Sequence, residues 1–291
     1  MENPFTTIGS WGAHPGFFYA AVAIFALLAG SFLNVVIFRL PVMMDRAWRR
    51  ECREMLASEP VGAADPHEHL SLALPPSSCP RCGHRIRPWE NVPLLSYLVL
   101  RGRCSACRQR ISVRYPLVEL LSAVLSIAVA WRFGPHATTP LALLFTWSLV
   151  ALAVIDLDHH LLPDSICLPL LWAGLLLNSA GIFVPLAQSV WGAAIGYGCL
   201  WSVYWAFRLA TGKEGMGYGD FKLLAALGAW LGWKALPLVV IVSSALGAGI
   251  GVALILLRRR DRNAPIPFGP FLALAGWFAL MWNGTSPPPW P

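Results

Sequence analysis

The sequence predicts an all-α integral membrane protein with about eight transmembrane helices and a small metal-binding loop domain. Three observations predict this class. Hydrophobic residues make up 56% of the 291 residues. Charged residues make up only 13%, against about 25% in an average soluble domain, which is too few to cover a water-soluble surface. The apolar residues also gather in stretches long enough to cross a bilayer.

These apolar stretches can be placed along the chain, since a bilayer-spanning helix needs about 20 apolar residues. They lie at 17–38, 115–131, 138–155, 161–180, 185–207, 235–257 and 265–282, with a shorter one at 218–233 that begins in a Gly-rich run. The first stretch is not expected to be a cleaved signal peptide, because no Lys or Arg precedes it and it is too long.

The distribution of Lys and Arg predicts the orientation. With eight spans, 20 of the 22 Lys and Arg fall on one side of the membrane and only Arg132 and Lys234 fall on the other. Cytoplasmic loops are enriched in these residues, so the large loop at 39–114 is expected to be cytoplasmic and both termini to face outward. The same asymmetry explains most of the net charge of +7, and no nucleic-acid partner is expected.

Three regions follow from this topology. They are 1–40 with the outward N-terminus and first transmembrane helix, 41–114 with the cytoplasmic loop, and 115–291 with the helical membrane domain. Within the loop, 44–56 is predicted to form a basic amphipathic helix on the membrane surface, or alternatively a contact for substrate or lipid headgroups. A linker at 57–78 follows, in which His67 and His69 are expected to be solvated.

Two CxxC pairs in this loop predict a zinc site. The four cysteines are Cys79, Cys82, Cys104 and Cys107, with 21 residues between the pairs. Each pair offers two thiolates from one tight turn, and four thiolates complete a tetrahedron with no open position, so the metal is expected to be structural. Disulfides or free thiols are the alternative, but a cytoplasmic loop is reducing, which argues against disulfides. The other cysteines, Cys52, Cys167 and Cys199, are interpreted as ordinary buried or interfacial thiols.

Carboxylates within or beside the spans are costly and need an explanation. They are Glu119, Asp156, Asp158, Asp164 and Asp220. Asp156 ends the third span and Asp220 starts the shortest one, so both are expected at the same depth on the cytoplasmic side. The glycines at 215, 217 and 219 are expected to allow backbone conformations closed to other residues and to let a neighbouring helix approach closely.

Two neighbouring carboxylates in a partly desolvated site cannot both ionise easily. One keeps its proton, and together they can activate water for attack on a peptide carbonyl. The residues alone leave two alternatives open. One is a cation site with Asp158, His159 and His160; the other is a purely structural role. Asp158, His159 and His160 are themselves expected to lie in a short, solvated loop.

Four motifs in combination resemble a known family. Gly217–Lys222, GYGDFK, matches the GxGD signature of membrane aspartic proteases. Together with Asp156 in IDLDHHLLPD, the two CxxC pairs, and GSFLNVVIFRLP from Gly30 to Pro41, it closely resembles the bacterial type IV prepilin leader peptidases. The resemblance extends from about Gly30 to the last span.

The resemblance implies a bifunctional enzyme of the bacterial inner membrane. Such enzymes cut the short basic leader of prepilins and pseudopilins after a Gly at the cytoplasmic face. They then methylate the new N-terminal residue, commonly Phe, with S-adenosylmethionine. Carried over by motif, Asp156 and Asp220 are the catalytic pair, Gly217, Gly219 and Lys222 support the catalytic loop, and the four cysteines bind zinc. Membrane lipid is a further expected partner, and the sequence is compatible with a homodimer.

The methyl-donor site is less defined. No GxGxxG follows a strand, so a Rossmann cofactor domain is not expected. Contributions are expected from the cytoplasmic loop and first span, namely from Gly30, Asn34, Arg39, Glu90, Asn91, Gly102 and Glu119. Glu119 is equally well interpreted as a buried partner of Arg114 or another basic residue, and Trp89–Asn91 is expected to pack the zinc knuckle against the membrane. The alternatives to a bifunctional enzyme are a peptidase without methyltransferase activity and a cation-binding membrane transporter or scaffold.

Overall fold

The computed structural model describes residues 15–56, 70–213, 215–257 and 266–282. Within these residues the secondary structure is helical apart from two isolated antiparallel bridges, Ser78–Arg85 and Arg103–Arg110. The chain divides into two compact units, with the boundary after Ile127. The all-helical prediction is therefore confirmed for the described residues. His67 and His69 lie outside them, as do the Arg residues at 258–262.

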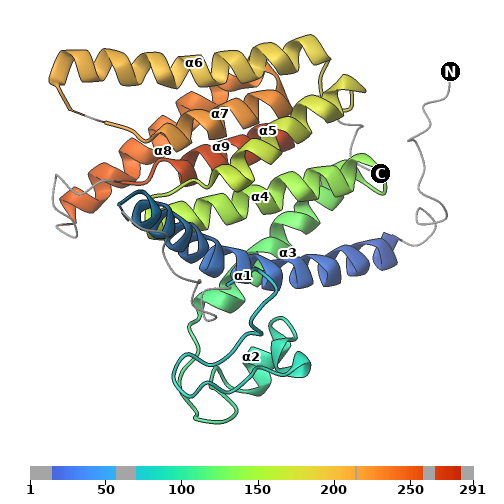
Figure 1. Ribbon diagram of the computed structural model, residues 1–291. Helices are drawn as coiled ribbons and strands as arrows, with labels where there is room; N and C mark the ends of the chain where they lie inside the picture. Colours follow the sequence, from blue (N-terminus) through green and yellow to red (C-terminus); the bar gives the residue numbers. More distant parts are fainter. Residues whose placement is uncertain (1–14, 57–69, 214, 258–265, 283–291) are drawn as a thin grey trace. The chain divides into compact units, whose positions relative to one another are not determined.

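Apart from the short α2, the helices overlap the apolar stretches that the sequence predicts. They are α1 Pro15–Leu56, α2 Leu95–Val99, α3 Arg114–Phe133, α4 Thr138–His159, α5 Asp164–Ser179, α6 Leu186–Thr211, α7 Tyr218–Leu231, α8 Leu236–Leu256 and α9 Gly269–Trp282 (Figure 1). In the part of the chain that the structure describes, four helical stretches are long and apolar enough to cross a membrane: Gly16–Leu56, Arg114–Phe133, Thr138–His159 and Trp233–Leu254. Helices α5 and α9 are apolar but shorter.

Helix α1 differs from the prediction. The sequence predicts a span at 17–38 and a separate surface helix at 44–56, but the structure has one helix of 42 residues with Pro41 inside it. A proline lacks one N–H, so the continuous helix loses the hydrogen bond to the Ile37 carbonyl. At 1.5 Å per residue the helix is about 63 Å long, roughly twice the hydrocarbon thickness of a bilayer.

In the first unit, small and polar residues hold α1 against α3. A Cβ atom on Gly30 would lie 2.8 Å from the Cα atom of Glu119, so only a glycine fits here. Ser122 Oγ donates a hydrogen bond to the Ala26 carbonyl at 3.0 Å, and Asn34 Nδ2 donates to the Tyr115 carbonyl at 3.1 Å. These contacts fix the register of the two helices.

In the second unit, α7 is the central helix. From Asp220 to Leu231 almost every residue is buried, and α7 packs against α5, α6 and α9 (Figure 1). The backbones of α6 and α7 touch at Gly192 and Gly228. Trp230 is fully buried, and its Nε1 donates to the Leu170 carbonyl of α5 at 2.7 Å.

The C-terminal end of α7 is held by Asn178 of α5. Its Nδ2 donates to the carbonyls of Ala229 and Trp230 at 2.8 and 3.3 Å, and its Oδ1 accepts from the amides of Phe183 and Val184 at 2.9 and 3.1 Å. Unpaired backbone groups are costly in a membrane. These four bonds therefore fix one end of the helix whose other end carries Asp220.

Candidate active site and metal centre

Asp156 lies in the last turns of α4, where only 5% of it is exposed. Its Oδ2 accepts a hydrogen bond of 3.0 Å from the amide of Gly269, the first residue of α9. The N-terminus of a helix carries a partial positive charge that favours a carboxylate. Sequence reasoning missed Gly269, although the Gly-Pro step that opens α9 is typical of a helix start.

The segment after Asp156 corrects one prediction. Asp158 and His159 were expected in a short loop, but both belong to α4, which ends at His159. His160 follows in a left-handed conformation, with φ 51°, and its amide donates to the Asp156 carbonyl at 2.9 Å. This left-handed residue caps the helix and explains why α4 extends beyond Asp156.

Asp220 is the third residue of α7 and is 7% exposed. Its amide donates to the Gly217 carbonyl at 3.3 Å. Among the described residues, its Oδ1 is buried and has no hydrogen-bond partner. Asp220 and Asp156, the two carboxylates expected to act together, belong to the same compact unit.

Leu162 lies beside both helix starts that surround the carboxylates. A Cβ atom on Gly219 would lie 2.8 Å from Leu162 Cβ. One on Gly269 would lie 2.6 Å from Asp156 Oδ2 and 3.1 Å from Leu162 Cδ2. The loop between α4 and α5 therefore packs directly against the Gly-Asp step of α7 and against the first residue of α9.

The glycines before Asp220 act by size, which corrects the prediction of unusual backbone conformations. Gly217 is extended, with φ −82° and ψ 150°, and nothing lies within 4 Å of the position of its Cβ. None of the three glycines has a positive φ. A Cβ on Gly215 would lie 2.8 Å from the Phe207 ring. Close approach is thus what Gly215 and Gly219 allow.

An ion pair joins the start of α7 to the start of α5. Lys222 Nζ lies 2.7 Å from each carboxylate oxygen of Asp164. Cys167, one turn into α5, is fully buried and interacts electrostatically with Asp164, Lys222, Asp220 and Asp156. The partnership of Lys222 with Asp164 could not be read from the sequence, where the two are 58 residues apart.

Aromatic residues line α6 and α7 beside Asp220. Tyr218 and Phe221 flank Asp220 in the sequence, and their rings lie 5.3 and 5.7 Å from the ring of Tyr204. The Arg208 guanidinium lies 5.3 Å from the Trp205 ring. Tyr, Trp and Arg together are typical of the polar boundary of a membrane.

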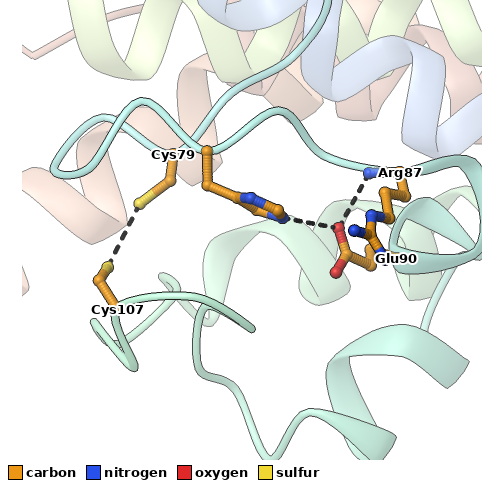
Figure 2. A network of polar contacts seen from close by, with 5 residues as sticks. Cys79, Arg87, Glu90 and Cys107 are labelled. Atoms are coloured by element: carbon orange, nitrogen blue, oxygen red, sulfur yellow. Dashed lines mark hydrogen bonds and ion pairs between the residues drawn. The ribbon is translucent and has the colours of Figure 1, made fainter.

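The four cysteines of the CxxC pairs come together in the first unit. The sulfur atoms of Cys79, Cys82, Cys104 and Cys107 all lie within 4.8 Å of one another. Cys79 Sγ and Cys107 Sγ are 3.8 Å apart (Figure 2). Tetrahedral zinc with Zn–S bonds of about 2.3 Å places its sulfurs about 3.8 Å apart, whereas a disulfide needs about 2.05 Å. The cluster therefore fits a zinc ion and excludes disulfides.

Both knuckles have the same backbone turn. The amides of Cys79 and Cys104 donate to the carbonyls of His84 and Gln109 at 2.9 and 2.8 Å. The fourth residue after each of these cysteines is left-handed, with φ 70° at Gly83 and 56° at Arg108. Hydrogen bonds from the backbone amides of Cys82 and Arg81 lower the pKa of Cys79 to about 6, whereas burial and the neighbouring thiols raise the pKa of Cys82 to about 11.

Two residues predicted to contact a methyl donor hold the fold of the knuckle loop. Glu90 Oε2 accepts the Arg87 amide at 2.9 Å and lies 3.3 Å from His84 Nε2 (Figure 2). The Arg87 amide lowers the pKa of Glu90. Gly102 has φ 65°, and a Cβ there would lie 2.8 Å from the Tyr97 hydroxyl.

Asn34 and Glu119, which were also predicted to contact the methyl donor, make contacts that hold α1 and α3 in place. Asn34 bonds to the Tyr115 carbonyl. Glu119 Oε2 accepts the Leu94 amide at 2.8 Å. A cleft of about 580 Å³ lies in the knuckle loop, and of the seven residues predicted to contribute to the methyl-donor site only Asn91 lines it. Its lining is Pro76, Ser77, His84, Arg85, Ile86, Arg87, Pro88 and Asn91.

Comparison with known proteins covers nearly the whole chain. A family described as the bacterial peptidase A24 N-terminal domain matches residues 24–133, and the type IV leader peptidase family matches residues 143–252. Proteins named prepilin leader peptidase/N-methyltransferase from Pseudomonas putida, Pseudomonas aeruginosa and Xanthomonas campestris are 57%, 55% and 46% identical to it. Each alignment covers 92 or 93% of both chains.

No solved structure gives a significant match. The identities over nearly the full length of both chains exceed what a shared fold alone would require. The chain therefore belongs to the prepilin leader peptidase/N-methyltransferase family.

Proposed function

We propose that this chain removes the leader of type IV prepilins and pseudopilins after a Gly and then methylates the new N-terminal residue, commonly Phe. The observation that carries the proposal is the pair of buried carboxylates, Asp156 and Asp220, in one helical unit, where Leu162 packs against Gly219 beside Asp220 and against Gly269, whose amide binds Asp156. The names and identities of the relatives support the substrate and both reactions.

In the proposed cleavage, Asp156 and Asp220 act on one water molecule. One carboxylate takes a proton from the water, whose oxygen attacks the scissile carbonyl, while the other carboxyl is protonated and donates a hydrogen bond to that carbonyl. The C–N bond then breaks and the departing amine takes a proton. The Gly269 amide, bonded to Asp156, orients one carboxylate. Lys222, paired with Asp164, holds the start of α7, and α7 carries Asp220.

Zinc in the proposal is structural. Four thiolates fill its coordination sphere, so the ion has no position for water or substrate. Cys79, Cys82, Cys104 and Cys107 would hold it, and two short knuckles with few internal contacts would be folded around it. Its proposed task is to shape the loop, not to take part in cleavage.

S-adenosylmethionine supplies the methyl group that the new amine accepts, which is mainly a task of positioning. We place its site in the unit that contains the knuckles, with Asn34, Glu90, Gly102 and Glu119 as its candidate contacts. In the structure, Asn34 and Glu119 use their polar atoms on the backbone of Tyr115 and Leu94. Contact with the methyl donor would therefore require these bonds to be exchanged.

The proposed topology follows from the placement of charges. The chain is an inner-membrane protein, and we propose eight spans, both termini outward, and the knuckle loop and carboxylates on the cytoplasmic side. The functional division is 1–40, 41–114 and 115–291. Prepilins are the proposed substrates, lipid surrounds the helices, and a homodimer is compatible with this topology.

The test compares wild type with Asp156→Asn and Asp220→Asn in proteoliposomes. Cleavage of a prepilin and methylation of a pre-cleaved prepilin are scored separately, with unchanged amide-exchange protection of α7 as the control for folding. We expect both variants to lose cleavage and to keep methylation. A variant that cleaves at the wild-type rate removes its residue from the pair. Altered ion flux with intact cleavage would support the cation-transporter alternative.

A further inference from the structure

The knuckle loop exposes large apolar side chains that lie outside the predicted spans. They occur within eleven residues and are Trp89, Val92, Leu95, Leu98 and Val99, hereafter the α2 apolar surface. Leu98 is 71% exposed and Val99 is 73% exposed. Leu95, Leu98 and Val99 are three and four residues apart on α2 and therefore share one face of it. A small domain in water would bury such a cluster.

The charge around this surface is almost entirely positive. Residues 70–114 contain eight Arg, no Lys and one acidic residue, Glu90, which is engaged with the Arg87 amide. A zinc ion with four thiolates would subtract two charges and leave the segment strongly basic. Arg85 and Arg87 precede the α2 apolar surface, and Arg101 and Arg103 follow it. All four are exposed.

A hydrogen bond holds the start of α2 beside the first turns of α3. The amide of Leu94, directly before α2, donates to Glu119 Oε2 at 2.8 Å. Glu119 lies five residues into α3, which is about 8 Å along the helix. Helix α3 is one of the stretches long and apolar enough to cross a membrane. The start of α2 is therefore held beside the end of a membrane-crossing helix.

We propose that the α2 apolar surface lies in the interface of an anionic bilayer, with Arg85, Arg87, Arg101 and Arg103 contacting the phosphates of acidic lipid headgroups. Apolar side chains bordered by Arg are typical of segments that lie in the plane of a membrane surface. Arg87 is already stacked 5.5 Å from the Trp89 ring, which joins the charged and apolar parts. The proposal does not depend on the reaction that the chain performs.

Amide hydrogen exchange of the full-length, zinc-loaded protein tests this proposal. The protein is reconstituted in nanodiscs of phosphatidylcholine, in nanodiscs with about one quarter phosphatidylglycerol, and in maltoside micelles. We expect the amides of residues 95–100 to exchange about tenfold more slowly in the anionic nanodiscs than in micelles, with neutral nanodiscs between them. Added salt should reduce the difference between the two kinds of nanodisc.

Paired variants separate lipid contact from other causes of protection. Leu98→Glu with Val99→Glu should abolish the lipid-dependent slowing. Leu74→Glu, at a Leu that is 64% exposed in the same loop, should leave it unchanged. Arg85→Gln with Arg103→Gln should remove the preference for phosphatidylglycerol. Unchanged zinc content and unchanged exchange in α7 show that each variant is folded.

Several outcomes would overturn the proposal. Equal protection in micelles and in both nanodiscs would mean that the surface is covered by the protein itself. Protection that increases with protein concentration in micelles would identify a second copy as the occupant. Protection that survives Leu98→Glu with Val99→Glu would show that these side chains do not contact the membrane.

Discussion

Gly269→Ala should separate the geometry of the carboxylate pair from the stability of the fold. The new Cβ would lie 2.6 Å from Asp156 Oδ2, whereas an ordinary contact begins near 3.4 Å. The oxygen must therefore retreat by about 0.8 Å, the difference between these two distances. The atom that must move is the end of a side chain, so the helices can stay in place.

A displacement of about 1 Å at a reacting group can cost about 100-fold in rate, or about 2.7 kcal/mol of transition-state stabilisation. We expect Gly269→Ala to lower kcat for prepilin cleavage by about that factor, with little change in thermal stability and with methylation of a pre-cleaved substrate retained. The assay is single-substrate cleavage in proteoliposomes.

Gly249→Ala in α8 is the matched control, because nothing lies within 4 Å of its added Cβ. It should cleave at the wild-type rate. If Gly269→Ala also cleaves within twofold of wild type, the position of Asp156 does not limit cleavage and its bond to the Gly269 amide has no catalytic role.

Three further perturbations probe other parts of the structure. Chelation of zinc, or Cys107→Ser, should make residues 70–113 sensitive to protease. Helix α7 should keep its protection from amide exchange, because the metal belongs to the first unit only. Metal analysis before chelation should give one zinc per chain. Lys222→Met should lower kcat for cleavage by about fivefold, because an exposed ion pair contributes up to about 1 kcal/mol. The charge exchange Lys222→Asp with Asp164→Lys should restore part of the lost activity. No restoration would argue against a role of the ion pair. Asn178→Leu removes the partner of the Trp230 carbonyl and of the Phe183 and Val184 amides, at about 1–3 kcal/mol each, whereas the Ala229 carbonyl keeps its bond from Ser189 Oγ. We expect a loss of folded protein in detergent, measured by size-exclusion chromatography; a monodisperse variant would contradict the role of Asn178.

The sequence predicts the helices and the four-cysteine cluster well because each depends on local pattern. An apolar run and a CxxC spacing carry their own structural meaning, and α4, α6 and α7 start within one residue of the expected positions. The contacts that hold the carboxylates are different. Gly269 meets Asp156 across 113 residues, and no local pattern encodes that distance.

Local rules also misplaced some boundaries. A span at 17–38 and a separate surface helix at 44–56 were expected, but α1 continues through Pro41 as one helix. Within it, Arg39 binds the loop, with its Nη2 2.7 Å from the Pro75 carbonyl. Asp158 and His159 are polar enough for a loop, yet α4 includes both. For α4, the end is set by the left-handed residue His160.

The shortness of α7 bears on how the protein is made. Its 14 residues rise about 21 Å, less than the roughly 30 Å of a hydrocarbon core, so this helix inserts poorly as an isolated segment. Its packing against α5, α6 and α9 supplies the enclosure, and α9 is translated after it. We therefore expect Asp220 to reach its place only after α9 has been synthesised, and a nascent chain without α9 not to cleave.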